Sequence, residues 1–396
     1  MVLLSVTGFF IGVCFALIQF QNPHASSADI VQHGKQSSED LLQTIRRLES
    51  QVSTLEKNLA SERKTRRAKD ETGANGAKES TVATATPVIA RADRHTTWRP
   101  SAKLDKNDPE FGAFLRTVAV NDEVLVAVSN INYARKGGML DLWMDGVRRS
   151  GVKNAMVVAL DEETKRNAEA RGVKAFLFDV QIPESQKDNG GNHATSALKF
   201  AILKRFMKLG YSVLLSDVDV ITLRNPFNDL VRDSDVECMS DGFDDNTAYG
   251  WDDAIEDPAM GWSRFAHTMR IFVFNSGLFY MRPTEATMAL LEKVIMAVET
   301  TGGWDQAIFN ECIFFPNSPT NTDPSVTRRV MDRNVFMNSK TLFVFLRHDS
   351  TQLEATKPAM IHVNYHPDKF QRMLAIVDYY VKGDKEALMG FPDGSE

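Results

Sequence analysis

One stretch of the sequence, YSVLLSDVDVITLRNPF, spans residues 211–227 and shows most clearly how the chain folds. Its first six residues are mostly apolar, as expected of a short buried strand, and the Asn-Pro pair near its end marks a turn. Between them, Asp217 and Asp219 stand one position apart. In α/β proteins, ligands gather beyond the carboxyl ends of the strands. The stretch therefore predicts a buried strand that carries two carboxylates to a ligand site.

The residues around this stretch alternate between strand and helix patterns. Strands are predicted at 123–130, 154–161 and 173–180, and helices at 139–151, 162–172 and 194–210. Strands that alternate with helices of this length imply crossover connections and a mostly parallel sheet covered on both faces. We therefore predict a Rossmann-like α/β domain over residues 105–396. A GxGxxG motif does not follow the first strand, which disfavours a dinucleotide-dependent oxidoreductase.

The composition bears on core size, on nucleic-acid binding and on possible disulfides. The 396 residues are 43% hydrophobic, which is enough to build a large core, and the net charge is -6. A chain without a basic surface is not expected to bind nucleic acid, whose phosphates need positive charge. Cys238 and Cys312 are the only cysteines in the predicted domain, and the sequence leaves open whether they form a disulfide.

Residues 1–18 carry no charged side chain. A run of this length is about long enough to cross a bilayer and longer than the ~7–15 apolar residues of a signal peptide. We therefore predict a signal anchor over residues 1–20, with membrane attachment. A cleaved signal is the alternative, because HASSA at 24–28 has the small residues of a cleavage site. No Lys or Arg precedes the run, so loop charge does little to orient it.

Residues 21–104 are predicted to form a stem. Leucine, isoleucine and valine recur every three or four residues over about 38–60, the pattern of a coiled coil. Fewer than three heptads are present, so a lone amphipathic helix and a homodimer through the stem both remain open. Residues 61–87 are charged at first and then rich in Ala, Thr and Gly, which indicates a disordered linker.

The acidic pair has the chemistry of a metal site. If the strand geometry continues, residues 217 and 219 point to the same face, so the two carboxylates converge. Two carboxylates at such a short distance repel each other, and a cation beside them offsets this repulsion. Oxygen ligands suit Mg²⁺ or Mn²⁺, which bridge to substrate phosphates. The alternative is that the Asp-x-Asp pattern occurs by chance and only caps a turn.

Two further segments carry candidate ligand-binding groups. In FNSGLFYMRPT, residues 274–284, Asn275 and Ser276 offer hydrogen bonds and Gly277 allows the backbone to approach a ligand closely. In GGWDQAIFNECIF, residues 302–314, Asp305 and Gln306 fall in the first turn of a predicted helix. A carboxylate at a helix N-terminus is also favourable in its own right, so Asp305 alone does not establish a site.

A third segment, MIHVNYHPDKF at 360–370, ends a predicted strand with His362, His366 and Lys369. Either histidine could complete a metal site, and we favour His362 because it ends the strand directly. A lysine there could hold a phosphate as a point charge. The run at 240–257 holds seven acidic residues and is consistent with a solvated loop, although its aromatic residues could also stack on sugar rings.

Together, LLSDVDVITLRNPF, FNSGLFYMRPT, WDQAIFN and HVNYHPDKFQRMLAIVDYY resemble the nucleotide-diphospho-sugar transferases of glycosyltransferase family 77, a plant and green-algal group. The last motif is most similar to that of the "reduced residual arabinose" arabinosyltransferases. The resemblance covers roughly residues 120–390. It implies a GT-A fold, a single-pass type II Golgi membrane protein with a lumenal catalytic domain, a UDP-sugar donor, a divalent metal and retention of anomeric configuration.

The resemblance also assigns roles to residues. Asp217 would contact the ribose or sugar of the donor and share the metal. Asp219 would bind the metal and diphosphate, and His362 would be the third protein ligand. The donor side would be completed by Asn275, Ser276, Gly277, Asp305, Gln306, Lys199 and Lys369, of which Asp305 and Gln306 are the catalytic candidates and Lys369 meets the β-phosphate.

The sequence leaves the substrates open. L-Arabinofuranose is the expected donor sugar and a glycan or hydroxyproline-rich glycoprotein the expected acceptor, by resemblance alone, with xylosyl or galactosyl transfer as alternatives. A nucleotidyltransferase or phosphohydrolase would show a Gly-rich phosphate loop or more clustered ligands early in the domain, and neither is present. A non-catalytic, membrane-tethered scaffold of a glycan-synthase complex remains the other alternative.

Overall fold

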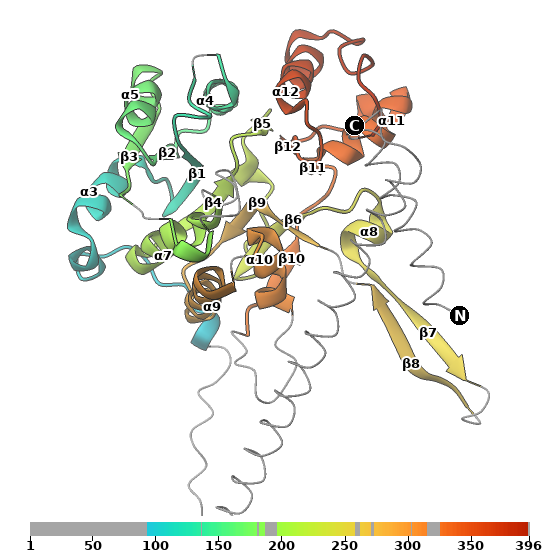
Figure 1. The fold of residues 1–396 in the computed structure, drawn as a ribbon, viewed down its shortest axis with the longest axis horizontal. Coiled ribbons are helices and arrows are strands. Elements are labelled where there is room, and N and C mark those ends of the chain that lie inside the picture. Colours follow the sequence, from blue (N-terminus) through green and yellow to red (C-terminus); the bar gives the residue numbers. More distant parts are fainter. Residues whose placement is uncertain are drawn as a thin grey trace, which may run out of the picture. The chain divides into compact units, whose positions relative to one another are not determined.

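The computed structural model describes residues 93–135, 137–179, 182–186, 196–257, 262–270, 273–301, 303–314 and 325–394, with only the backbone described at 251–257 and 262–270 (Figure 1). The predicted anchor, the coiled coil and the linker lie outside these residues. Within them, no helix is both long and apolar enough to cross a bilayer.

The main sheet has seven strands among the described residues. Their spatial order is β10 (Arg328–Val330), β6 (Val236–Ser240), β9 (Phe274–Met281), β4 (Ser212–Ser216), β1 (Glu123–Ser129), β2 (Ala155–Ala159) and β3 (Lys174–Leu177). All neighbouring pairs are parallel except the two that involve β9. The predicted α/β class with a mostly parallel sheet is therefore confirmed.

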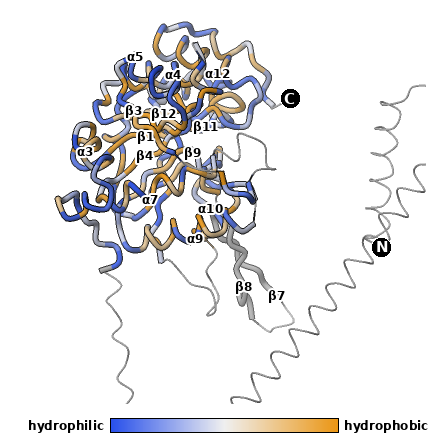
Figure 2. Tube along the Cα trace, turned by 60° about the vertical axis from the view of Figure 1, so that its left-hand side comes forward, coloured by the Kyte–Doolittle hydropathy of each residue, from blue (hydrophilic) through white to orange (hydrophobic). Residues whose placement is uncertain are grey.

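The sheet is buried on both faces, and its strands show why. Along β1, Val124 and Val126 pack into one hydrophobic cluster, whereas Leu125 and Ala127 pack into another. Successive side chains on a strand point to opposite faces, so an unbroken apolar run fills two cores at once. Figure 2 shows hydrophobic residues along these central strands and hydrophilic residues over much of α5.

Helices cover the two faces. The first cluster takes side chains from α3 (Pro109–Val118), α7 (Lys199–Leu209), α9 (Glu285–Thr301) and α10 (Asp305–Phe314). The second takes them from α4 (Met139–Arg149) and α5 (Glu162–Ala170). The remaining α-helices of the described residues are α8 (Asp245–Tyr249), α11 (Ser350–Ala355) and α12 (Lys369–Val377).

A small second sheet, not predicted from the sequence, positions the site. Its described strands are β11 (Phe336–Asn338), β12 (Met360–His362) and β5 (Val220–Thr222). The strands β12 and β5 pair antiparallel, with His362 opposite Val220. Because Val220 follows Asp219 directly, this pairing brings the end of β12 to the acidic pair, although the two segments are far apart in sequence.

Other parts of the chain differ from the sequence-based expectation. The strand β9 is antiparallel to its neighbours β4 and β6. The run at 240–257, which was consistent with a solvated loop, contains β7 (Trp251–Asp257), and this strand pairs with β8 (Trp262–Arg270). The packed chain also starts before residue 105, because the Trp98 indole donates a 2.7 Å hydrogen bond to the carbonyl of Met207. Cys238 and Cys312 are buried free thiols, which answers the question of a disulfide.

Candidate active site

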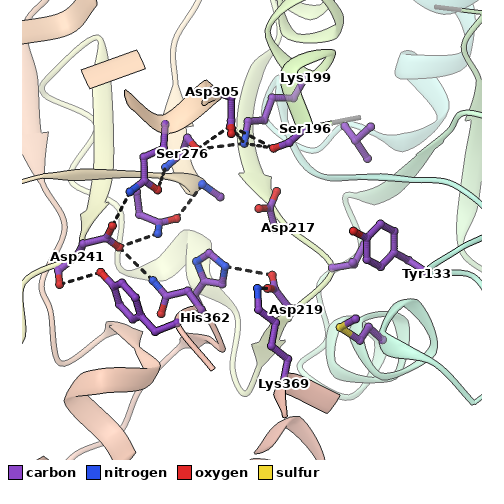
Figure 3. A pocket seen from close by; sticks show the side chains of 18 of the residues that line it. Tyr133, Ser196, Lys199, Asp217, Asp219, Asp241, Ser276, Asp305, His362 and Lys369 are labelled. Carbon is purple, nitrogen blue, oxygen red and sulfur yellow. Dashed lines mark hydrogen bonds and ion pairs between the residues drawn. The ribbon is translucent and has the colours of Figure 1, made fainter. Parts of the chain in front are cut away.

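One cavity of about 540 Å³ lies where β4 and β12 end and β9 begins, next to the start of α10. Its volume is within the range of small-molecule sites. The residues predicted from the sequence that line it are Lys199, Asp217, Asp219, Asn275, Ser276, Gly277, Asp305, Gln306, His362 and Lys369. The structure therefore brings all ten together at one pocket (Figure 3).

The acidic pair converges, but not for the predicted reason. The strand β4 stops at Ser216, and the chain then turns, with the backbone N–H of Val220 bonded to the carbonyl of Asp217 at 3.3 Å. The turn, not a continued strand, carries Asp217 and Asp219 to the pocket. Ligand atoms of these two carboxylates and of His362 all lie within 4.8 Å of one another.

This trio fits a divalent cation. Nε2 of His362 lies 3.1 Å from Oδ1 of Asp219. Ligands at right angles on an ion such as Mg²⁺, held at about 2.1 Å, are about 3 Å apart. The Nδ1 atom of His362 has no hydrogen-bond partner among the described residues, although it is buried. The two carboxylates suit either Mg²⁺ or Mn²⁺, and the imidazole is a ligand better suited to a transition metal such as Mn²⁺.

Gly277 makes the trio possible. A Cβ atom at this position would lie 2.5 Å from Oδ2 of Asp217 and 2.6 Å from Cε1 of His362. Both distances are shorter than any ordinary contact. The sequence predicts that this glycine admits a ligand, and the structure shows that it also makes room for two side chains of the cluster. The Asp217 N–H donates to the Gly277 carbonyl at 2.7 Å, which fixes this close approach.

The pKa values of the two carboxylates are shifted in opposite directions. Burial raises the pKa of Asp217, reinforced by Asp219, although Lys199 acts against it. Burial would also raise the pKa of Asp219, but His362 and Lys369 outweigh it and hold that pKa below its usual range. The Lys369 ammonium lies 2.7 Å from Oδ2 of Asp219. Asp219 is thus neutralised by the protein, whereas none of the described residues forms an ion pair with Asp217.

A second charged cluster, around Lys199, occupies another wall of the pocket (Figure 3). The Lys199 ammonium lies 2.7 Å from Oδ2 of Asp305, and both side chains are only 3% exposed. The hydroxyls of Ser276 and Ser196 donate to the same oxygen at 2.9 and 3.1 Å. Burial opposes charge on both groups, yet their mutual attraction raises the pKa of Lys199 and lowers that of Asp305.

Several pocket residues have no role in the sequence-based prediction. They are Tyr133, Ser196, Asp241, Trp304, Asn364 and Tyr365. Asp241 had appeared only as one acid in a solvated run, and its neighbours along the chain give no hint of a special role. Burial raises the pKa of Tyr133, and the nearby Asp219 adds to this effect.

The structure separates the two candidate histidines. His362 lies in the cluster with the aspartates. His366 does not line the pocket; its buried ring packs against Phe343, with ring centroids 6.0 Å apart. Burial and the adjacent Arg372 lower the pKa of His366. The sequence had favoured His362 because it ends its strand, and this is the histidine that faces the acidic pair.

Comparison with known proteins places the chain in a family. The model of the family described as "Nucleotide-diphospho-sugar transferase" matches residues 150–373. The chain belongs to the nucleotide-diphospho-sugar transferase family. This confirms the family predicted from the motifs, so the protein is a glycosyltransferase of the nucleotide-sugar type.

Two relatives of this transferase come from Arabidopsis thaliana. Arabinosyltransferase RRA2 is 48% identical over 293 residues, which are 73% of this chain and 67% of that protein. Arabinosyltransferase RRA1 is 44% identical over 301 residues, 75% of this chain and 73% of that protein. Among solved structures, the galactosyltransferase LgtC with donor and acceptor analogues has a TM-score of 0.40 and 14% identity, covering 66% of this chain and 95% of that one.

Proposed function

We propose that this transferase moves L-arabinofuranose from a UDP-sugar to a glycan or hydroxyproline-rich glycoprotein, with a divalent cation, Mn²⁺ or Mg²⁺, and the GT-A form of the α/β fold. The observation that carries the proposal is the group formed by Asp217, Asp219 and His362 in the pocket of a nucleotide-diphospho-sugar transferase. The names of the RRA relatives support the choice of arabinose.

The charges of the pocket suit a nucleotide diphosphate. Asp217, Asp219 and His362 would hold the cation, which when bound neutralises the charge of the departing diphosphate. Lys369, beside Asp219, places a positive charge next to the position that a β-phosphate oxygen would take. The side chains of Asn275, Asp305 and Gln306 would then line the sugar.

Retention of configuration allows two routes. In one, Asp305 attacks the sugar and forms a covalent intermediate. In the other, the acceptor hydroxyl attacks on the face that the diphosphate leaves, and a phosphate oxygen takes its proton. We favour the second route, because Oδ2 of Asp305 already accepts from Lys199 and two serines. A glycosyl adduct trapped on Asp305, identified by peptide mass spectrometry, would contradict this preference.

For the cell, we propose a Golgi protein of type II topology, anchored by residues 1–20 and carried on a stem that ends before the packed residue Trp98. The apolar N-terminal run supports this proposal. Digestion of sealed microsomes with a protease tests it, since a lumenal domain is protected until detergent is added.

The donor is tested with purified full-length protein and Mn²⁺. UDP-arabinofuranose, UDP-arabinopyranose, UDP-xylose and UDP-galactose are each incubated, and released UDP is measured. We expect UDP-arabinofuranose to be hydrolysed fastest. Faster hydrolysis of UDP-xylose or UDP-galactose would replace arabinose in the proposal. No release from any donor, together with no binding of UDP, would favour the non-catalytic scaffold.

A further inference from the structure

Asp241 occupies a special position in the pocket. It follows the last residue of β6, Ser240, and its backbone N–H donates to the carbonyl of Val273 at 2.9 Å. Gly242, the next residue, is packed so tightly that a Cβ there would lie 2.2 Å from the backbone of Thr247 and Ala248. The backbone that carries this carboxylate is therefore held in place at the pocket wall.

Three carboxamide groups donate to this one carboxylate (Figure 3). Nδ2 of Asn275 lies 2.7 Å from Oδ1, and Nδ2 of Asn364 lies 3.1 Å from the same oxygen. Nε2 of Gln306 lies 2.7 Å from Oδ2. These residues come from β9, the segment after β12, and α10. Because an ionised carboxylate only accepts hydrogen bonds, each amide must present its nitrogen to it.

The oxygen of each amide is used as well. Oδ1 of Asn275 accepts from the Gly277 N–H at 2.8 Å, and Oε1 of Gln306 accepts from the Ser276 N–H at 3.3 Å. Oδ1 of Asn364 accepts from the Ser339 N–H at 3.3 Å. With both ends fixed, no amide can flip without losing two bonds. Each NH₂ group has two hydrogens, so Asn275 and Gln306 each keep one N–H that bonds to none of the described residues.

We propose that Asp241 is a positioning residue for the transferred sugar: it orients the amides of Asn275 and Gln306 so that their second N–H groups meet the sugar's hydroxyl oxygens. The role rests on the proposed function. It is separate from cation binding, because Asp241 is not part of the cluster formed by the other two aspartates and the histidine. The ligand class is a sugar with free hydroxyls, attached to a nucleoside diphosphate.

The substitution Asp241→Asn tests this geometry sharply. The new Oδ1 can keep the amides of Asn275 and Asn364, but the new Nδ2 faces Nε2 of Gln306, and two donors cannot bond. If Gln306 flips, its NH₂ group meets the Ser276 N–H, which is again a donor. No orientation of Gln306 satisfies both neighbours, whereas the acidic pair and His362 are unchanged.

The experiment uses full-length protein with Mn²⁺ and measures the affinities for UDP and for UDP-arabinofuranose by calorimetry. In Asp241→Asn, we expect the affinity for UDP to stay within about threefold of wild type. The ratio of the sugar-nucleotide Kd to the UDP Kd should rise about tenfold, the size of one or two lost hydrogen bonds. The control Asp245→Asn changes an acid at the start of α8, four residues further along the chain, that is 79% exposed and outside the pocket, and should leave the ratio unchanged.

The double variant Asp241→Asn/Gln306→Glu separates positioning from a structural role. The amide introduced at position 241 can donate to the new carboxylate at position 306, so the unfolding midpoint should recover. A glutamate has no N–H for the sugar, so the Kd ratio should stay high. A ratio unchanged in Asp241→Asn, or one that recovers together with stability in the double variant, overturns the proposal. Wild-type protein that binds no UDP with Mn²⁺ instead overturns the proposed function, and this role with it.

Discussion

The two sides of the pocket differ in how their charges are balanced. Around Lys199, Asp305 and Asp241, every charged group has protein partners, and the ion pair is almost fully buried. Around Asp217 and His362, two carboxylates and an imidazole crowd together, and burial raises the pKa of Asp217. The side around Lys199, Asp305 and Asp241, the complete side, therefore needs no ligand and can hold a rigid shape. The side around Asp217, Asp219 and His362, the open side, is completed by a cation from outside.

Breaking the complete side should have the largest effect. In Lys199→Met, the Asp305 carboxylate stays buried without its cation, so we expect unfolding to require about 3–5 kcal/mol less free energy. Urea denaturation measures the loss. The double variant Lys199→Met/Asp305→Leu removes both charges and should regain much of the stability. If the single variant is as stable as wild type, the pair does not hold this wall.

The open side should respond in activity more than in stability. Asp219→Asn keeps the shape of the side chain but weakens a proposed cation ligand. Loss of a residue that only hydrogen-bonds a metal ligand commonly lowers metal affinity or activity about 10–100-fold. Loss of a ligand itself should therefore lower the rate of donor hydrolysis more than about 100-fold. The rate with Mn²⁺ and the urea midpoint are measured on the same protein. A rate close to that of wild type would exclude this ligand.

Gly277→Ala should disturb the open side without changing any charge. The new methyl group collides with Asp217 and His362, so both must move. We expect the affinity for Mn²⁺ in the presence of UDP to fall about 10–100-fold. Gly390→Ala is the matched control, because a Cβ there meets no atom within 4 Å. Equal affinity in the two variants would show that the trio does not need this close packing.

Acid should weaken the complete side gradually. The pKa of Asp305 is lowered in the folded protein, against burial, chiefly by Lys199. Its stabilising contribution is therefore full above the unfolded pKa of about 4 and is lost as the pH falls through the lower folded value. The difference in unfolding free energy between wild type and Asp305→Asn should be constant from about pH 5 to 7 and shrink below about pH 4. A difference that grows on acidification would have the wrong sign.

Sequence reasoning reached the parts of this site that have local signals. An apolar run ending in Asp217 and Asp219 is recognisable because strand burial and surface carboxylates conflict over a few residues. Helix and strand periodicity likewise predicted β1, β2, β4 and α7, with their bounds close to those among the described residues.

The remainder depends on contacts between distant segments. The residues around Lys199 do not indicate that it pairs with Asp305, which is distant in sequence. The orientation of β9 depends likewise on its neighbours β4 and β6. The role of Asp241 could not be predicted, because it is one of seven acidic residues in its run and its three amide partners come from other segments. The small sheet that delivers His362 pairs strands of three residues, which are too short for a periodicity to appear.

Asp217, Asp219 and His362 should bind one divalent cation together with the nucleotide. Electron paramagnetic resonance of Mn²⁺, titrated into full-length protein with UDP, measures bound metal directly. We predict one Mn²⁺ per wild-type chain, its loss in His362→Ala and its retention in His366→Ala, whose histidine lies outside the pocket. Undiminished binding in His362→Ala, or loss only in His366→Ala, would contradict this assignment.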